Sequence, residues 1–217
     1  MATFPYKGVV FDFNGTLFND HEKHLLAWQQ MAKTLAGYDL SEEELEQHFH
    51  GVPNQVIIER LVGRSVDHET LEKYSQKKEA LYREACLADP AHLHLLAGAE
   101  AYFDKLQAAK IPMTICSASI KANIDFFFEV FNLARWFMYE KVVYDDGSYP
   151  DKIRMYQQAC HHLGLDPADV RVYEDAPSGI QNALAAGIGQ IVVISPKACA
   201  IQDERIIGIY PDFQSCV

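Results

Sequence analysis

Hydrophobic and polar positions follow a helical period over the segment from about residue 20 to residue 88. Apolar residues recur there every three or four positions, and no run of the kind that indicates a strand interrupts them. The pattern predicts four consecutive helices, over residues 20–36, 41–50, 53–62 and 67–88. Ser41-Glu42-Glu43-Glu44 is a capping box that begins the second helix, and Pro53 fits the first helical position of the third. We expect these helices to form one module.

The rest of the chain alternates short apolar runs with helical patterns. The pattern predicts strands over residues 9–11, 112–116, 136–144, 170–173, 191–194 and 206–209, and helices over residues 98–109, 120–131, 151–163 and 177–186. Such alternation across short turns is typical of a parallel sheet with helices on both faces. The sequence therefore predicts an α/β fold, with a Rossmann-like, doubly wound parallel sheet in a core domain of residues 1–17 and 96–217. An all-helical cap domain, residues 18–95, is inserted after the first strand and is expected over the strand ends.

The amino-acid composition limits the kinds of binding partner and the cellular compartment that we expect for this chain. The chain has 217 residues, of which 49% are hydrophobic, which is ample for a sizeable core. The formal net charge of -11 argues against a nucleic acid or an anionic membrane as the main partner, whereas a local site can still accept an anionic small molecule. Five scattered cysteines without a C-x-x-C pair fit a reducing compartment, and neither a signal-peptide layout nor a membrane-spanning run is seen. We expect a cytoplasmic monomer.

Three of the predicted strands end in polar residues, namely Asp12, Ser117 and Asp175. Because the carboxyl ends of parallel strands meet at one edge of a sheet, two carboxylates and a hydroxyl can converge there. Two carboxylates suit Mg²⁺, and a hydroxyl with the backbone N–H groups of a following helix suits a phosphate. Lys152, which follows a turn, can add positive charge. Each residue alone also fits a plain role, as a solvated carboxylate, a helix cap or a surface lysine, so their joint order is the evidence for a site.

That order resembles the haloacid dehalogenase-like phosphohydrolases. Asp12-Phe13-Asn14-Gly15-Thr16 is similar to the family's first motif, D-x-D-G-T, and Ser117-Ala118-Ser119 is similar to the second. Lys152 is the best match to the lysine of the third motif, although Ile153 follows it where the family usually has a proline. The run from Tyr173 to Ala183 is similar to the fourth motif. The helical insertion resembles the cap of the subgroup that contains β-phosphoglucomutase.

The resemblance implies a role for each motif residue. Asp12 would be the nucleophile that forms an aspartyl-phosphate, which divides one difficult displacement into two steps. Mg²⁺ would be held by Asp12, the backbone carbonyl of Asn14 and Asp175, with Glu174 as a supporting acid.

Phosphate binding would involve the second and third motifs. Ser117, the Ala118 N–H and Lys152 would hold the phosphoryl oxygens, and the substrate would be a small phosphorylated metabolite. Positioning and charge neutralisation of this kind is most of what phosphoryl transfer requires.

Asn14 departs from the family pattern, because family phosphatases have an aspartic acid there as general acid and base. An amide cannot exchange that proton, and general acid–base catalysis contributes about 10²–10⁴-fold, or ~3–5.5 kcal/mol. Residue 14 can still bind the metal, because its ligand is the backbone carbonyl and not the side chain. Retained Mg²⁺ and phosphate binding with weakened turnover is therefore expected. Three explanations remain open. The chain is a natural variant that is slow or uses another proton carrier, His24 from the cap being the first candidate; or it is a form substituted to trap an intermediate; or it binds phosphorylated ligands without turnover.

The sequence thus favours a Mg²⁺-dependent phosphatase of small phosphorylated metabolites such as sugar phosphates. One alternative is a catalytically impaired protein that binds phosphorylated ligands. Another is a β-phosphoglucomutase-like mutase, which is disfavoured because the cap turn at residues 50–54 lacks the arginine that such a mutase uses for a second phosphate. The same turn lacks the lysine of phosphonatases. Trp28 and Cys116 are interpreted as core residues.

Overall fold

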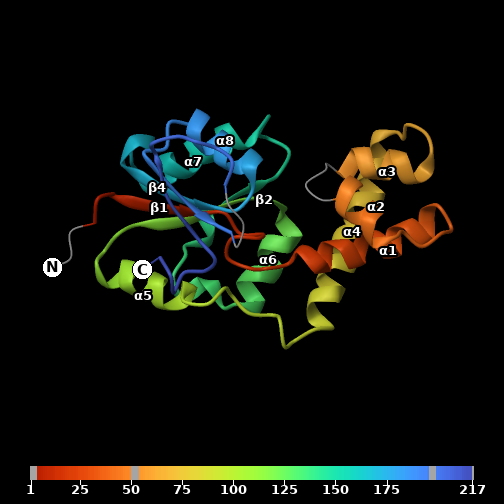
Figure 1. Cartoon of the computed structure of the whole chain (residues 1–217), viewed down its shortest axis with the longest axis horizontal. Helices are drawn as coiled ribbons and strands as arrows, with labels where there is room; N and C mark the ends of the chain where they lie inside the picture. The colour runs from red at the N-terminus through yellow and green to blue at the C-terminus, as the bar shows by residue number, and fades with distance from the viewer. Residues whose placement is uncertain (1–3, 50–53, 196–198, 217) are drawn as a thin grey trace. The chain divides into compact units, whose positions relative to one another are not determined.

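The computed structural model describes residues 4–49, 54–195 and 199–216. The chain divides into two compact units, one of Met1–Asn19 with His94–Val217 and one of Asp20–Leu93. The first is an α/β unit and the second is helical (Figure 1). The predicted helix start at Pro53 and most of the turn at residues 50–54 lie outside the described residues.

The α/β unit is built on a six-stranded parallel sheet of order β3-β2-β1-β4-β5-β6. The strands are β1 Gly8–Phe11, β2 Met113–Ile120, β3 Val143–Asp145, β4 Val170–Glu174, β5 Gln190–Ile194 and β6 Ile206–Tyr210. The four residues of β1 are buried, as expected of a central parallel strand that is covered on both faces. This confirms the predicted α/β fold with a doubly wound parallel sheet. The register aligns Phe11 with Ile115 on one side and with Tyr173 on the other.

Helices cover both faces of this sheet. They are α5 Ala99–Ala108, α6 Lys121–Val130, α7 Lys152–Leu163 and α8 Pro177–Ala185. Val10 belongs to a core cluster with Tyr156 of α7 and Ile180 of α8. Its neighbour Phe11 points to the opposite face, where its ring lies 5.1 Å from that of Phe103 on α5. The alternation of side chains along β1 thus supplies one apolar residue to each core.

Two details of the predicted strands are wrong. Residues 136–142 do not form a strand, and β3 is limited to Val143–Asp145. The apolar residues before it cover the sheet instead, because the Trp136 indole donates to Asp104 at 2.6 Å and the Phe137 ring packs 5.0 Å from that of Phe103. The second correction concerns β2, which does not end at Ser117. It continues to Ile120, with an irregular register against β3.

The helical unit contains α1 His21–Leu35, α2 Glu42–His48, α3 Asn54–Val62 and α4 His68–Leu87. The predicted capping box is present, since the Glu44 N–H donates to Ser41 Oγ and the Ser41 N–H donates to the Glu44 carboxylate. Trp28 is buried in the core of this unit with Met31 and Ile57, as predicted. No helix among the described residues is long and apolar enough to cross a membrane.

Candidate active site

Three carboxylates gather at the carboxyl ends of β1 and β4. Asp12 directly follows β1, Glu174 is the last residue of β4, and Asp175 comes next. Each can offer an oxygen within 4.8 Å of the others. The neighbouring parallel strands bring Asp12 beside Glu174, and the Asp12 N–H donates to the Tyr173 carbonyl at 3.0 Å. Asp12 and Glu174 are buried, so their charges are costly unless they are paired.

Lys152 supplies a positive charge to this cluster. It is the first residue of α7, whose N-cap Asp151 accepts a hydrogen bond from the Arg154 N–H. Its ammonium donates to Asp12 Oδ1 at 2.6 Å and to Glu174 Oε1 at 2.5 Å. The lysine proposed from the sequence as the third-motif residue therefore does reach the carboxylates.

The cluster contains three carboxylates and one ammonium, and burial raises the pKa values of Asp12 and Asp175. Burial raises the pKa of Asp12 to about 7, and the Lys152 ammonium only partly opposes it. Burial, together with the charges of Asp12 and Glu174, raises the pKa of Asp175 to about 8. Burial disfavours the Lys152 ammonium, but the two adjacent carboxylates outweigh that effect and hold its pKa well above the usual value. An additional cation would relieve this imbalance.

Both carboxylate oxygens of Glu174 accept hydrogen bonds from the protein. Its Oε2 accepts hydrogen bonds from the N–H groups of Asp175 and Ala176, both at 2.8 Å, and Oε1 accepts one from the Tyr156 hydroxyl at 3.1 Å in addition to that from Lys152. A Cβ added to Gly179 would lie 1.6 Å from Oε1. Through its hydrogen bonds to the N–H groups of Asp175 and Ala176, Glu174 orients the turn that carries Asp175. Tyr156 and Gly179 were not predicted as site residues, and only the Pro177-Ser178-Gly179 turn sequence after β4 signals the close approach.

Asp175 is oriented by the turn that follows β1. Thr16 Oγ1 donates to Asp175 Oδ1 at 3.0 Å. Gly15 has a φ of +80°, and a Cβ there would lie 2.2 Å from Asp175 Oδ2. Only glycine combines that backbone conformation with so close an approach. The segment from Asp12 to Thr16 therefore positions both carboxylates that were proposed as metal ligands.

Asn14 is held by the second motif. Its side-chain Oδ1 accepts hydrogen bonds from Ser117 Oγ at 3.2 Å and from Ser119 Oγ at 2.7 Å. The Ser119 N–H in turn donates to Ser117 Oγ at 3.1 Å. Ala118 lies between them and is exposed. The irregular end of β2 thus brings both serine hydroxyls to the residue that departs from the family pattern.

His24 lies on α1 of the helical unit, where each of its two ring nitrogens has a charged neighbour. The Lys78 ammonium is 2.7 Å from Nδ1, and Asp20 Oδ2 is 3.4 Å from Nε2. Its ring stacks on that of Tyr82 with a centroid separation of 4.1 Å. Because the ammonium can only donate, the imidazole presents Nδ1 as acceptor and carries its proton on Nε2.

The donor set fits a hard divalent cation. All the side-chain ligand atoms of the cluster are carboxylate oxygens, which Mg²⁺ prefers, and its three carboxylates are paired with a single ammonium, that of Lys152. Asp12, Asp175 and the backbone carbonyl of Asn14 are the groups that would hold it.

Comparisons with known proteins identify the family. The family model described as haloacid dehalogenase-like hydrolase matches residues 9–193, which is most of the chain. The chain belongs to this family. A solved hydrolase of the same family from Entamoeba histolytica (family IA, variant 3) is 31% identical, with a TM-score of 0.88, and the match covers 96% of this chain and 94% of that one.

One further relative is named for a phosphorylated compound, and one further structure of similar fold contains such a compound. The validoxylamine A 7'-phosphate phosphatase of Streptomyces hygroscopicus subsp. limoneus is 27% identical over 186 residues, which cover 84% of this chain and 83% of that protein. A mutant of CbbY from Rhodobacter sphaeroides, solved with xylulose-1,5-bisphosphate, has the same fold, with a TM-score of 0.75 at 18% identity over 96% of this chain and 95% of that one. The chain is thus a haloacid dehalogenase-like hydrolase, as the sequence motifs indicated.

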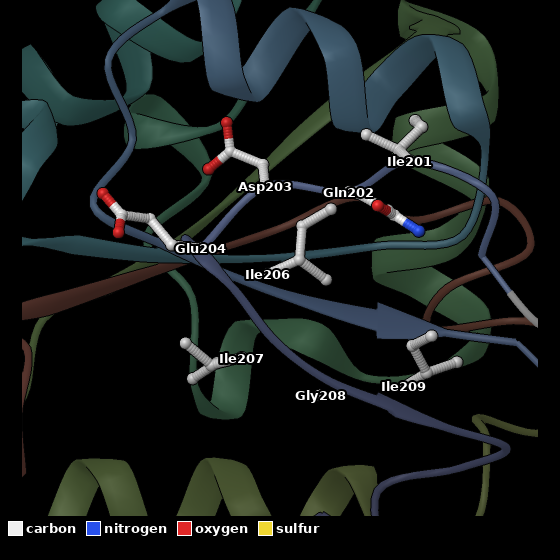
Figure 2. A pocket seen from close by; sticks show the side chains of 8 residues that line it. All are labelled: Ile201, Gln202, Asp203, Glu204, Ile206, Ile207, Gly208 and Ile209. Carbon is white, nitrogen blue, oxygen red and sulfur yellow. The ribbon is translucent and has the colours of Figure 1, made fainter.

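An open groove of about 680 Å³ lies elsewhere on the α/β unit, along the edge strand β6 (Figure 2). Its lining includes the exposed side chains of Ile207 and Ile209. None of its lining residues belongs to the carboxylate cluster, so the groove is no part of the candidate site.

Proposed function

We propose that this hydrolase is a Mg²⁺-dependent phosphatase of small phosphorylated metabolites whose turnover is limited by Asn14. The observation that carries the proposal is the convergence of Asp12, Asp175, Glu174 and Lys152 at the ends of two neighbouring strands. Asp12 is the nucleophile: a carboxylate oxygen forms a bond to phosphorus, and the ester oxygen departs with the electrons of the broken P–O bond. Water then hydrolyses the resulting acyl phosphate and restores the carboxylate.

The remaining residues position the phosphoryl group. The Lys152 ammonium, the Ser117 hydroxyl and the Ala118 N–H are the proposed donors to its oxygens, and the hydroxyl must first leave Asn14 Oδ1. Mg²⁺, when bound, neutralises part of the charge that develops on the phosphoryl group. Glu174 keeps the Asp175 turn and the Lys152 ammonium in place through the hydrogen bonds described above.

Asn14 makes leaving-group departure slow. A carboxylic acid at this position would donate a proton to the ester oxygen and later accept one from water, whereas the amide can do neither. His24 is the proposed substitute donor or substrate ligand from the cap. Its Nε2–H can donate a hydrogen bond to a substrate oxygen, for which it must leave Asp20. Transfer of a proton also requires Nδ1 to be protonated, and Nδ1 must therefore leave the Lys78 ammonium.

The names and ligands of similar proteins support a proposal for the substrate class. The Streptomyces relative is named for the phosphate of a sugar-like compound, and the CbbY structure contains a sugar bisphosphate. We infer a sugar phosphate or a similar polyol phosphate for this chain, with specificity set by residues of the helical unit. A cytoplasmic location and a monomeric state remain predictions.

The test is phosphate release from a panel of sugar phosphates, with and without Mg²⁺, for the chain as it stands and for Asn14→Asp. We expect slow, Mg²⁺-dependent release, a rise of about 10²-fold or more in Asn14→Asp, and loss of activity in Asp12→Ala. Equal and substantial rates in the chain and in Asn14→Asp would assign the proton to another group, and His24→Ala would then be decisive.

A second candidate function is supported by the hydrogen bonds of Asn14. Because an amide that both serine hydroxyls hold in place cannot exchange a proton, the site can hold a phosphorylated ligand through the Lys152 ammonium and the Ala118 N–H without turning it over. Binding of phosphate esters by both versions of the chain, with no release by either, would establish this ligand-binding function in place of the phosphatase.

A further inference from the structure

Asn14 is followed by glycine, and the sequence contains no other Asn-Gly pair. Asparagine is a chemically labile residue, and lability is greatest before glycine, whose backbone nitrogen is least obstructed. We propose that Asn14 is a self-modification site, at which spontaneous deamidation converts the amide into the carboxylate that the family uses for acid–base catalysis. The consequence for activity rests on the proposed phosphatase function, whereas the modification itself does not.

The surroundings of the amide favour attack on its carbon. Ser117 and Ser119 both donate hydrogen bonds to Asn14 Oδ1, at 3.2 and 2.7 Å. Two donors on one carbonyl oxygen withdraw electron density from Cγ and stabilise the negative charge that develops on that oxygen when a nucleophile adds. This is the same arrangement that an oxyanion hole offers to a substrate carbonyl.

The reaction needs only water. The backbone nitrogen of Gly15 forms a bond to Cγ of Asn14 and gives up its proton, the Cγ–Nδ2 bond breaks, and ammonia leaves. Water then opens the cyclic imide at one of its two carbonyls. Cleavage of the Cγ–N bond yields a side-chain carboxylate with the normal backbone, while cleavage of the other C–N bond yields an isoaspartyl linkage. One water enters, one ammonia departs, and nothing is oxidised or reduced.

The turn that contains Asn14 controls the rate. The Gly15 N–H donates to the Phe18 carbonyl at 2.8 Å, and the N–H groups of Leu17 and Phe18 both donate to the Phe13 carbonyl. The Gly15 nitrogen must leave its hydrogen bond before it can add to Cγ. Conversion therefore proceeds from a locally opened turn and is slower than in an unstructured peptide of the same sequence.

The two products differ in their effect on the site. A normal aspartate keeps the backbone carbonyl of residue 14 where the cation would be bound. An isoaspartyl linkage adds a methylene to the main chain next to Gly15, whose approach to Asp175 leaves no room for a displaced backbone. Only the normal product is expected to gain phosphatase activity.

The test follows freshly purified full-length protein during incubation in mildly alkaline buffer. Peptide mass spectrometry measures the amide-to-acid mass change at residue 14, with Asn132 and Asn182 in the same digest as internal controls. We expect the mass change at Asn14 alone, and a slower change in Ser119→Ala, which removes one donor from Oδ1. An Asn14 peptide that keeps its amide as long as the two control peptides do would overturn the proposal.

Activity provides the second readout, with Mg²⁺ and a sugar phosphate as substrate. Turnover should rise in proportion to the normal aspartyl fraction, towards the rate of Asn14→Asp, and Asn14→Gln should change in neither mass nor activity. The isoaspartyl and aspartyl peptides have the same mass and are separated by chromatography. If the isoaspartyl peptide accounts for all of the product and turnover stays constant, the restored site is refuted. If Asn14→Asp itself is inactive, the phosphatase function fails, whereas the mass change still decides the modification.

Discussion

The affinity for Mg²⁺ is expected to depend steeply on pH, because a cation must displace protons from the carboxylates that would bind it. In the metal-free protein the pKa of Asp12 is raised to about 7 and that of Asp175 to about 8, chiefly by burial. Carboxylates in the unfolded chain titrate near pH 4. Lowering the pH from about 8 to about 6 therefore protonates both ligands in the folded protein and neither in the unfolded chain.

The magnitude follows from proton competition. At about pH 6 the two groups reduce the apparent affinity roughly 10-fold and 100-fold, and at about pH 8 together only about twofold. The dissociation constant for Mg²⁺ should thus rise by about two to three orders of magnitude over this range. The metal-free protein should show the opposite trend in stability. Since the folded state binds more protons than the unfolded state between these pH values, its free energy of unfolding falls as the pH rises.

Calorimetric titration of the full chain with Mg²⁺ at the two pH values measures the first effect, and thermal unfolding without metal measures the second. Asp203→Asn is the matched control, because the pKa of Asp203 is lowered to about 2 by the adjacent Arg205 and the residue lies outside the cluster. This variant should reproduce both pH dependences. A dissociation constant that stays the same within about threefold would refute the assignment of Asp12 and Asp175 as the ligands that compete with protons.

Two substitutions test how Lys152 and Gly179 stabilise the carboxylate cluster of Asp12, Glu174 and Asp175. Lys152→Met should lower the free energy of unfolding by about 3–5 kcal/mol in chemical denaturation, because it leaves Asp12 and Glu174 buried without their cation; a loss under about 1 kcal/mol would contradict this. Gly179→Ala should cost about 1–3 kcal/mol, because the added methyl displaces the Glu174 carboxylate. Ser178→Ala, on the exposed side of the same helix, is its control, and equal stability of these two variants would show that the helix shifts without strain.

Much of the fold could be predicted from local patterns. A parallel strand that is covered on both faces must be apolar throughout, so Val9-Val10-Phe11 identifies β1 without knowledge of its neighbours. The capping box at Ser41 is equally local, since all its hydrogen bonds lie within four residues. The motifs at Asp12 and Asp175 were found for the same reason: each follows an apolar run, and parallel strands bring such ends to one edge.

Only the tertiary structure decided how these residues act on one another. Asn14 and Ser117 are separated by 103 positions, and their hydrogen bond depends on the irregular end of β2, which apolar periodicity does not encode. The contact of Gly179 with Glu174 likewise requires the strand and helix to pack first. Trp136 and Phe137 show the same limit in the core, because burial requires an apolar residue but does not distinguish a strand from a loop that covers the sheet. Composition and period specify what must be buried and where strands end, whereas contacts between distant residues are fixed by packing alone.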